Sequence, residues 1–170
     1  RAMACMKHVG LNVASDPLYS VSYMGVNGGL VIVVADDPGL YSSQNEQDTR
    51  MVARAAQIPV IEPSDSAEAK DFFKMAFELS EKFDRPFIFR TTTRLAHSQG
   101  LVELQERIEP EDKPYEKNVQ KNVMMPGNAK VRHIEIEKRN LELAEVANTL
   151  PINRVEMNDT KIGVITSGIP

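Results

Sequence analysis

Residues 25–50 read GVNGGLVIVVADDPGLYSSQNEQDTR, and the architecture we expect for the chain follows from this stretch. A Gly-rich turn leads into the uninterrupted apolar run Leu30–Ala35, which stops abruptly at Asp36 and Asp37. A continuous β-branched run is typical of a strand that is buried on both faces of a parallel sheet. The polar residues 42–48 follow its carboxyl end, where open α/β sheets bind their ligands. We therefore expect an α/β fold with a candidate site at that edge.

The segments around this stretch alternate between strand and helix patterns. Apolar residues predict further buried strands at 2–6, 59–61 and 86–90. Periodic apolar residues and capping signals predict helices at 11–24, 45–56 and 66–83. Such alternation implies parallel strands that are joined by right-handed crossovers, with helices on both faces of the sheet. We predict a three-layer α/β domain over residues 1–104.

The composition changes after residue 104. Residues 106–121 are highly charged and lack a core period, which indicates a surface linker. A charged helix is expected over 132–150, with Ile134, Leu141, Ala144 and Leu150 available for packing. The apolar run 161–166 predicts another strand. We therefore interpret 105–160 as a connector and 161–170 as the start of a second α/β domain, and we interpret the whole chain as part of a longer protein.

Composition narrows the class of protein. The 170 residues are 42% hydrophobic and 26% charged, which is ordinary for a globular protein. A net charge of -4 offers no basic field for nucleic acid, and no apolar run approaches the length of a membrane helix. The single cysteine, Cys5, rules out an internal disulfide framework and a four-thiolate metal site within this chain. We expect a reducing, cytoplasmic location.

The first candidate site lies at the carboxyl end of the strand 2–6 and comprises Lys7, His8, Gly10 and Asn12. Parallel strands bring this loop and the loop 36–48 to one edge of the sheet. Lysine, histidine and asparagine side chains there could contact an aromatic heterocycle or an anion. The alternative interpretation is a tight strand-to-helix turn with exposed polar residues.

The second candidate site follows the central strand and comprises Gln44, Asn45, Arg50 and Arg54. An arginine at this position could fork onto a substrate carboxylate. The alternative is an exposed helix on which Glu46 and Arg50 form an i,i+4 pair.

Other motifs indicate no catalytic residue and no metal ligand. Asp36 and Asp37 could hold Mg²⁺, but no phosphate loop or second acidic cluster accompanies them, so we interpret them as caps of turns and of the next helix. His97 and Ser98 lack an acid that would orient the imidazole. The glycines at 25–29 precede their strand, which argues against a dinucleotide fingerprint.

Four segments together resemble one family. They are MKHVGLNVASDPL (6–18), GVNGGLVIVVADDPG (25–39), SSQNEQDTR (42–50) and RTTTRLAHSQG (90–100). They stand in the same order as in the α subunit of the indolepyruvate ferredoxin oxidoreductases, which are thiamine-diphosphate-dependent 2-oxoacid:ferredoxin oxidoreductases. The resemblance implies that residues 1–104 are an N-terminally truncated pyrimidine-binding domain and that 161–170 begin a transketolase-C-like domain.

The family likeness also implies an activity. Members oxidatively decarboxylate aryl 2-oxoacids such as indolepyruvate to acyl-CoA and CO2, and ferredoxin accepts the electrons. The complete protein would use thiamine diphosphate with Mg²⁺ and 4Fe-4S clusters, pair with a β subunit and form an oligomer. The family's activating glutamate matches a position upstream of Arg1, and its diphosphate and iron–sulfur segments match positions downstream. The 170 residues alone are therefore expected to be inactive and to bind no cofactor tightly.

The resemblance assigns roles to both candidate sites. Residues 7–12 resemble the loop beside the pyrimidine ring, and 44–54 resemble the segment that faces the substrate, with Arg50 or Arg54 meeting its carboxylate. Two rival interpretations are a non-catalytic assembly module and a Rossmann-like phosphate binder. All of this depends on one prediction, that the loops 7–12 and 36–50 converge on a shared rim of the sheet.

Overall fold

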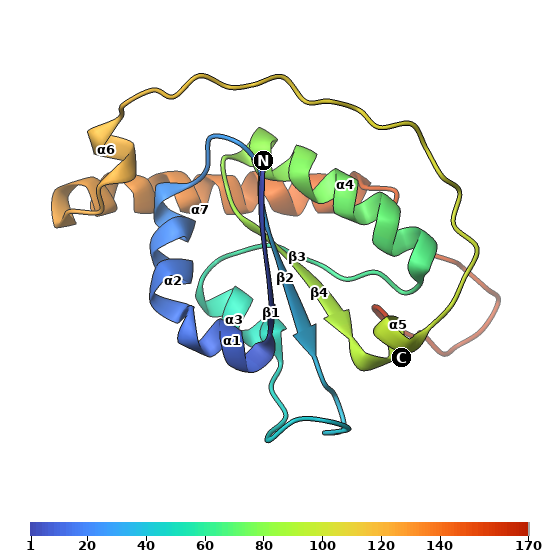
Figure 1. The fold of residues 1–170 in the computed structure, drawn as a ribbon. Coiled ribbons are helices and arrows are strands. Elements are labelled where there is room, and N and C mark those ends of the chain that lie inside the picture. The colour runs from blue at the N-terminus through green and yellow to red at the C-terminus, as the bar shows by residue number, and fades with distance from the viewer. Residues whose placement is uncertain (170) are drawn as a thin grey trace.

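A four-stranded, all-parallel sheet forms the centre of the computed structural model, which describes residues 1–169 (Figure 1). The strands are β1 (Ala2–Lys7), β2 (Leu30–Asp36), β3 (Val60–Ile61) and β4 (Phe87–Thr92), in the spatial order β1-β2-β4-β3. The helices are α1 (His8–Val13), α2 (Ser15–Met24), α3 (Thr49–Ala55), α4 (Ser66–Phe83), α5 (Thr93–His97), α6 (Val119–Asn122) and α7 (Pro126–Thr149). The predicted α/β fold with a parallel sheet is confirmed.

Two hydrophobic clusters cover the two faces of the sheet, because successive side chains of a strand point to opposite faces. On β2, Ile32 and Val34 belong to the first cluster, which includes side chains of α1, α2 and α3. Val31 belongs to the second cluster, which contains the inner face of α4. Both faces of β2 are therefore covered, as its uninterrupted apolar run predicts.

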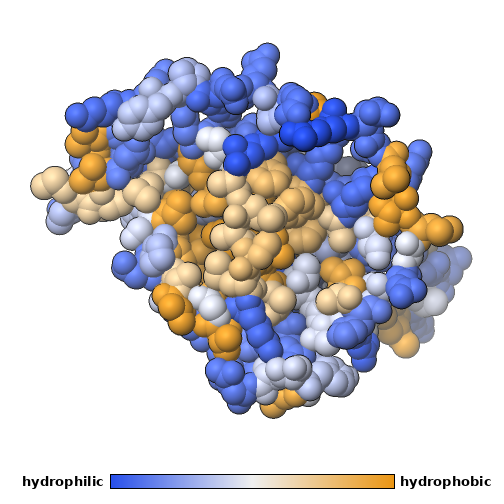
Figure 2. Space-filling view, in the orientation of Figure 1, coloured by the Kyte–Doolittle hydropathy of each residue, from blue (hydrophilic) through white to orange (hydrophobic). Residues whose placement is uncertain are grey.

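The first strand differs from its prediction. It was expected to be buried, but β1 lies at an edge of the sheet, where Met3 is 57% exposed and Cys5 is also exposed. Figure 2 shows apolar residues gathered at the centre of this face, over β1. An apolar run indicates that a strand belongs against other protein, but it does not specify which part of the structure covers it. Within residues 1–169 no strand lies beyond β1.

The region after residue 104 also departs from expectation. Residues 106–117 form an extended surface segment, as predicted for a linker. Helix α7 begins earlier than expected, at Pro126, and packs Leu143, Val146 and Leu150 against the core. Of the residues that were expected to be available for packing, three are exposed: Ile134 (68%), Leu141 (73%) and Ala144. The prediction was wrong for these three.

The strand that was expected at 161–166 is not formed. These residues are exposed, and no described strand lies beside them to supply the hydrogen bonds that a strand needs. Of the helices over residues 1–169, none is both long and apolar enough to cross a membrane.

Candidate functional site

The two loops that were predicted to converge meet at the carboxyl ends of β1 and β2. Lys7 Nζ donates a hydrogen bond to the Ser42 carbonyl oxygen at 2.9 Å. Asn12 Nδ2 donates to Gln47 Oε1 at 2.7 Å. Figure 1 shows the loop after β2 at the same end of the sheet as α1. The prediction of a shared rim is therefore confirmed, and we refer to residues 7–12 and 36–50 as the rim.

Asp37 holds the loop of the rim in place. Its Oδ2 accepts hydrogen bonds from the Ser42 amide and the Ser43 hydroxyl, both at 2.7 Å, and its Oδ1 accepts from Thr93 Oγ1 at 2.6 Å. The bonds from Thr93 and Ser43, and then that from Ser42, lower the pKa of Asp37 from 3.8 to about 2. The carboxylate is thus ionised at neutral pH and joins the loop to the start of α5.

Asp36 is buried beneath the rim and belongs to an ion network. It accepts hydrogen bonds from the Thr49 amide at 3.0 Å, from the Thr49 hydroxyl and from Arg90 Nε at 2.6 Å. Arg90 is 4% exposed and also pairs with Glu62, which follows β3. The network joins β2, β4 and the start of α3. These contacts support the interpretation of both acids as structural groups.

The role of Arg90 was not predicted, although the sequence carries one signal for it. Arg90 continues the apolar run Phe87-Ile88-Phe89 inside a strand that is buried on both sides. An arginine in that position needs a carboxylate partner, because an unpaired buried charge is very costly.

No group of three or more histidine, cysteine or acidic side chains within residues 1–169 is arranged to hold a metal ion.

His8 is the unusual polar group of the rim. It is 1% exposed, and neither of its ring nitrogens has a hydrogen-bond partner among the described residues. Leaving such a group unpaired costs about 1–3 kcal/mol. Close packing favours glycine at position 10, because a Cβ there would lie 3.0 Å from Met6 Cβ.

Of the four residues that were predicted to contact the substrate, three lie at the rim and one does not. Gln44 and Asn45 are exposed on the loop, and Asn45 Oδ1 accepts from Gln47 Nε2 at 2.7 Å. Arg50 lies at the rim and donates to the Asp48 carboxylate, with Nη2 at 2.8 Å from Oδ2. This hydrogen bond raises the pKa of Arg50.

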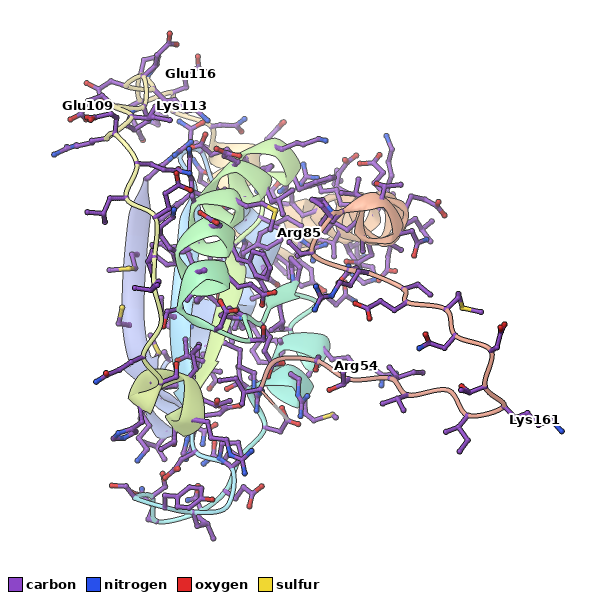
Figure 3. The ribbon with its side chains drawn as sticks, turned by 90° about the vertical axis from the view of Figure 1, so that its right-hand side faces the viewer. Arg54, Arg85, Glu109, Lys113, Glu116 and Lys161 are labelled. Carbon is purple, nitrogen blue, oxygen red and sulfur yellow. The ribbon has the colours of Figure 1, made fainter. Side chains whose placement is uncertain are left out.

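Arg54 lies elsewhere. It is exposed near the carboxyl end of α3, and Figure 3 shows it directed away from the loop and beside the C-terminal segment. Of the two arginines that the sequence left open, only Arg50 lies with the other rim residues.

Comparison with known proteins shows which family the chain is similar to. It is 48% identical over 176 residues to the indolepyruvate oxidoreductase subunit IorA of Pyrococcus horikoshii. The subunits of the same name from Archaeoglobus fulgidus and Methanothermobacter marburgensis are each 46% identical to it. The matches cover 99% of this chain but only 27–28% of the relatives' length. They confirm the family resemblance inferred from the sequence. No family model matches the chain, and no solved structure matches it significantly.

Proposed function

Because this chain is homologous over nearly its whole length to the IorA subunits of indolepyruvate oxidoreductases, we propose that it is one region of such a subunit. The complete complex, with its β subunit, oxidatively decarboxylates aryl 2-oxoacids such as indolepyruvate. Coenzyme A takes the acyl group, and ferredoxin accepts the electrons. Iron–sulfur clusters would be held by parts of the complex outside these 170 residues.

Within that complex, the rim is proposed to form half of the cleft for thiamine diphosphate. The observation that carries this proposal is that the two loops are hydrogen-bonded to each other at the rim, through Lys7 with Ser42 and Asn12 with Gln47. His8, which lies between Lys7 and Asn12 in the sequence, is a buried imidazole whose nitrogens have no partner within residues 1–169. The His8 imidazole is covered in this structure, so binding would have to uncover it before it could hydrogen-bond the pyrimidine ring. Lys7 and Asn12 would keep the loop 42–48 beside the ring. When bound, the cofactor supplies the nucleophilic carbon that attacks the 2-keto group of the substrate.

Arg50 is proposed to bind the substrate carboxylate. Its guanidinium is held by Asp48 and lies 3.9 Å from Glu62, so it is oriented at the rim with its side chain still 47% exposed. A substrate carboxylate would replace Asp48 as the partner of the guanidinium. Gln44 and Asn45 on the neighbouring loop are exposed and would contact the rest of the substrate.

The domain organisation is part of the same proposal. Residues 1–104 would belong to a pyrimidine-binding domain, 105–160 to a connector and 161–170 to the next domain. The uncovered apolar edge at β1 supports the view that other polypeptide of the subunit packs there. The relatives' greater length is consistent with this view.

Calorimetric titration of thiamine diphosphate into the complete complex tests the cofactor site. We expect His8→Ala and Asn12→Ala each to weaken binding by about tenfold, which corresponds to the loss of roughly one hydrogen bond. Lys74→Ala, on an exposed turn of α4, is the matched control and should bind normally. Normal binding and activity in both rim variants would contradict the proposal and favour an assembly module. Tight nucleotide binding would favour a phosphate binder.

Steady-state kinetics with indolepyruvate test the substrate site. Removing a charge-assisted hydrogen bond costs about 1.5–3 kcal/mol, so Arg50→Ala should lower kcat/KM by about tenfold or more. Arg54→Ala should change it little, because Arg54 points away from the rim. Equal losses in the two variants, or a loss confined to Arg54→Ala, would contradict the assignment.

A further inference from the structure

Helix α7 exposes a stripe of apolar side chains. Val131, Ile134 and Leu141 are 62%, 68% and 73% exposed, and Ala144 is exposed beside them. Their spacing of three and seven residues puts them on one face of the helix. The opposite face packs Leu143, Val146 and the fully buried Ile136 inward. In Figure 3, α7 is viewed nearly along its axis at the outer side of the molecule, with side chains directed into solvent.

Exposed charges of both signs lie on this face of the helix. Lys130 and Glu137 lie in its amino-terminal half, and Lys138 and Glu145 lie in its carboxyl-terminal half. Lys138 and Glu142 are 69% and 51% exposed and lie 4.0 Å apart, so this pair is weakly held. Lys130 and Glu145 stand at equal distances from the middle of the helix and carry opposite charges, and the same is true of Glu137 and Lys138. This face is therefore complementary to an antiparallel copy of itself.

We propose that this face of α7, which we call the α7 stripe, is an interface between two copies of the chain that pair their α7 helices antiparallel. A two-fold axis between Glu137 and Lys138 sets Ile134 opposite Leu141 of the second copy and Val131 opposite Ala144 of the second copy. The same axis sets Lys130 opposite Glu145 of the second copy. One operator therefore matches both the apolar side chains and the charges.

A parallel arrangement of the two helices lacks this match. It would set Lys130 against Lys130 and Glu145 against Glu145, and like charges that face each other are destabilising. The 24 residues of α7 span about 36 Å, so the stripe can extend across several turns of a partner helix. This inference uses only α7 and does not depend on the cofactor or substrate assigned to the rim.

Charge reversal in the full-length subunit tests the pairing. Sedimentation equilibrium should give a dimer dissociation constant that Lys130→Glu and Glu145→Lys each raise by about tenfold. The double variant Lys130→Glu/Glu145→Lys should return to near the unmodified value, since the reversed pair is again complementary. Glu109→Lys, in the exposed segment before α6, is the control and should have no effect. A monomeric unmodified subunit, unchanged single variants or a double variant that fails to recover would overturn the proposal.

Photo-crosslinking gives the arrangement independently of affinity. A benzophenone side chain at position 134 should crosslink to the peptide that contains Leu141 of the second copy, as identified by mass spectrometry of mixed isotope-labelled subunits. The same group at position 148 should reach the peptide around Gly127 of the second copy. Crosslinks from position 134 to segments of its own subunit outside α7, to another protein or to itself in a parallel pair would each refute the proposed interface.

Discussion

Arg90 lies buried at the carboxyl end of β4 with two carboxylates around it. Its Nε donates to Asp36 at 2.6 Å, and its Nη1 pairs with Glu62. Asp36 is itself 1% exposed, so neither charge of this pair is solvated. The attraction between such groups does little more than offset the cost of desolvating them. Removing one partner is different, because it leaves the other buried and uncompensated.

We therefore expect Arg90→Ala to lower the free energy of unfolding by about 3–5 kcal/mol, because Asp36 keeps only the hydrogen bonds from Thr49. Urea denaturation measures the change. Arg50→Ala is the control and should cost less than about 1 kcal/mol, because its ion pair with Asp48 is substantially exposed. Equal losses in the two variants would mean that the buried pair has no special role in stability.

Among the elements, α4 is fixed against the start of β2 by hydrogen bonds and close packing. The Gly29 amide donates to Glu81 Oε1 at 3.1 Å, and the Leu30 amide donates to Ser80 Oγ at 2.9 Å. Gly29 permits this approach, because a Cβ there would lie only 2.9 Å from the Phe77 carbonyl oxygen. The neighbour that would have to move is backbone, so α4 itself would have to shift.

Gly29→Ala is expected to destabilise the fold by about 1–3 kcal/mol through this overpacking. Thermal denaturation should show a lower midpoint temperature. Gly127→Ala provides a contrast in the first turn of α7, where nothing lies within 4 Å of the new Cβ. That change should be neutral or stabilise by up to about 1 kcal/mol, because alanine favours helix over glycine. A neutral Gly29→Ala would show that α4 is not closely seated on β2.

Over the molecule as a whole, Asp84 joins α6 and α7 to the part of the chain that forms the sheet. It accepts a hydrogen bond from the Val26 amide at 2.8 Å and forms ion pairs with Lys121, Arg132 and Arg139. Asp84 ends α4 in the left-handed conformation, at φ 50°. One carboxylate thus holds the turn before β2, α6 and α7 together.

Arg85 adds to this junction. It lies between the sheet and α7 (Figure 3), and its Nη1 donates to Asn140 Oδ1 at 2.5 Å. Burial, and then the nearby Arg139, lower the pKa of Arg85 to about 10, so the group is still charged at neutral pH. Helix α7 is therefore attached both by these polar contacts and by the apolar side chains of Ile136, Leu143 and Val146.

Asp84→Asn should loosen the attachment of α6 and α7 without unfolding the sheet, because asparagine tolerates the left-handed conformation but carries no charge. We expect amide hydrogen exchange over 119–149 to accelerate by about tenfold, equivalent to ~1.4 kcal/mol, with smaller changes in β2 and β4. Glu109→Gln removes a solvent-exposed ion pair and should leave exchange in α7 unaltered. Uniform acceleration throughout the chain would instead indicate that α6, α7 and the sheet unfold as one unit.

Apolar periodicity and capping residues predicted those helices and strands whose determining residues are close together in the sequence. Helix α4 begins and ends at the expected residues, because Asp65 Oδ1 accepts from the Glu68 amide and Glu68 in turn accepts from the Ser64 amide. The shared rim was also predictable, since parallel strands leave their loops at one edge. Both inferences use interactions or geometry that a short window of residues contains.

The tertiary structure alone decided the features that depend on distant partners. Asp36 meets Arg90 across 54 positions, Lys7 meets Ser42 across 35, and neither pairing is encoded in the residues next to them. The same holds for the edge position of β1, for Arg50 rather than Arg54 at the rim, and for the face of α7 that turns outward. The hydrophobic pattern of a sequence predicts whether a side chain is buried or exposed. It does not predict which residues surround that side chain, because strand order and helix packing bring remote segments together.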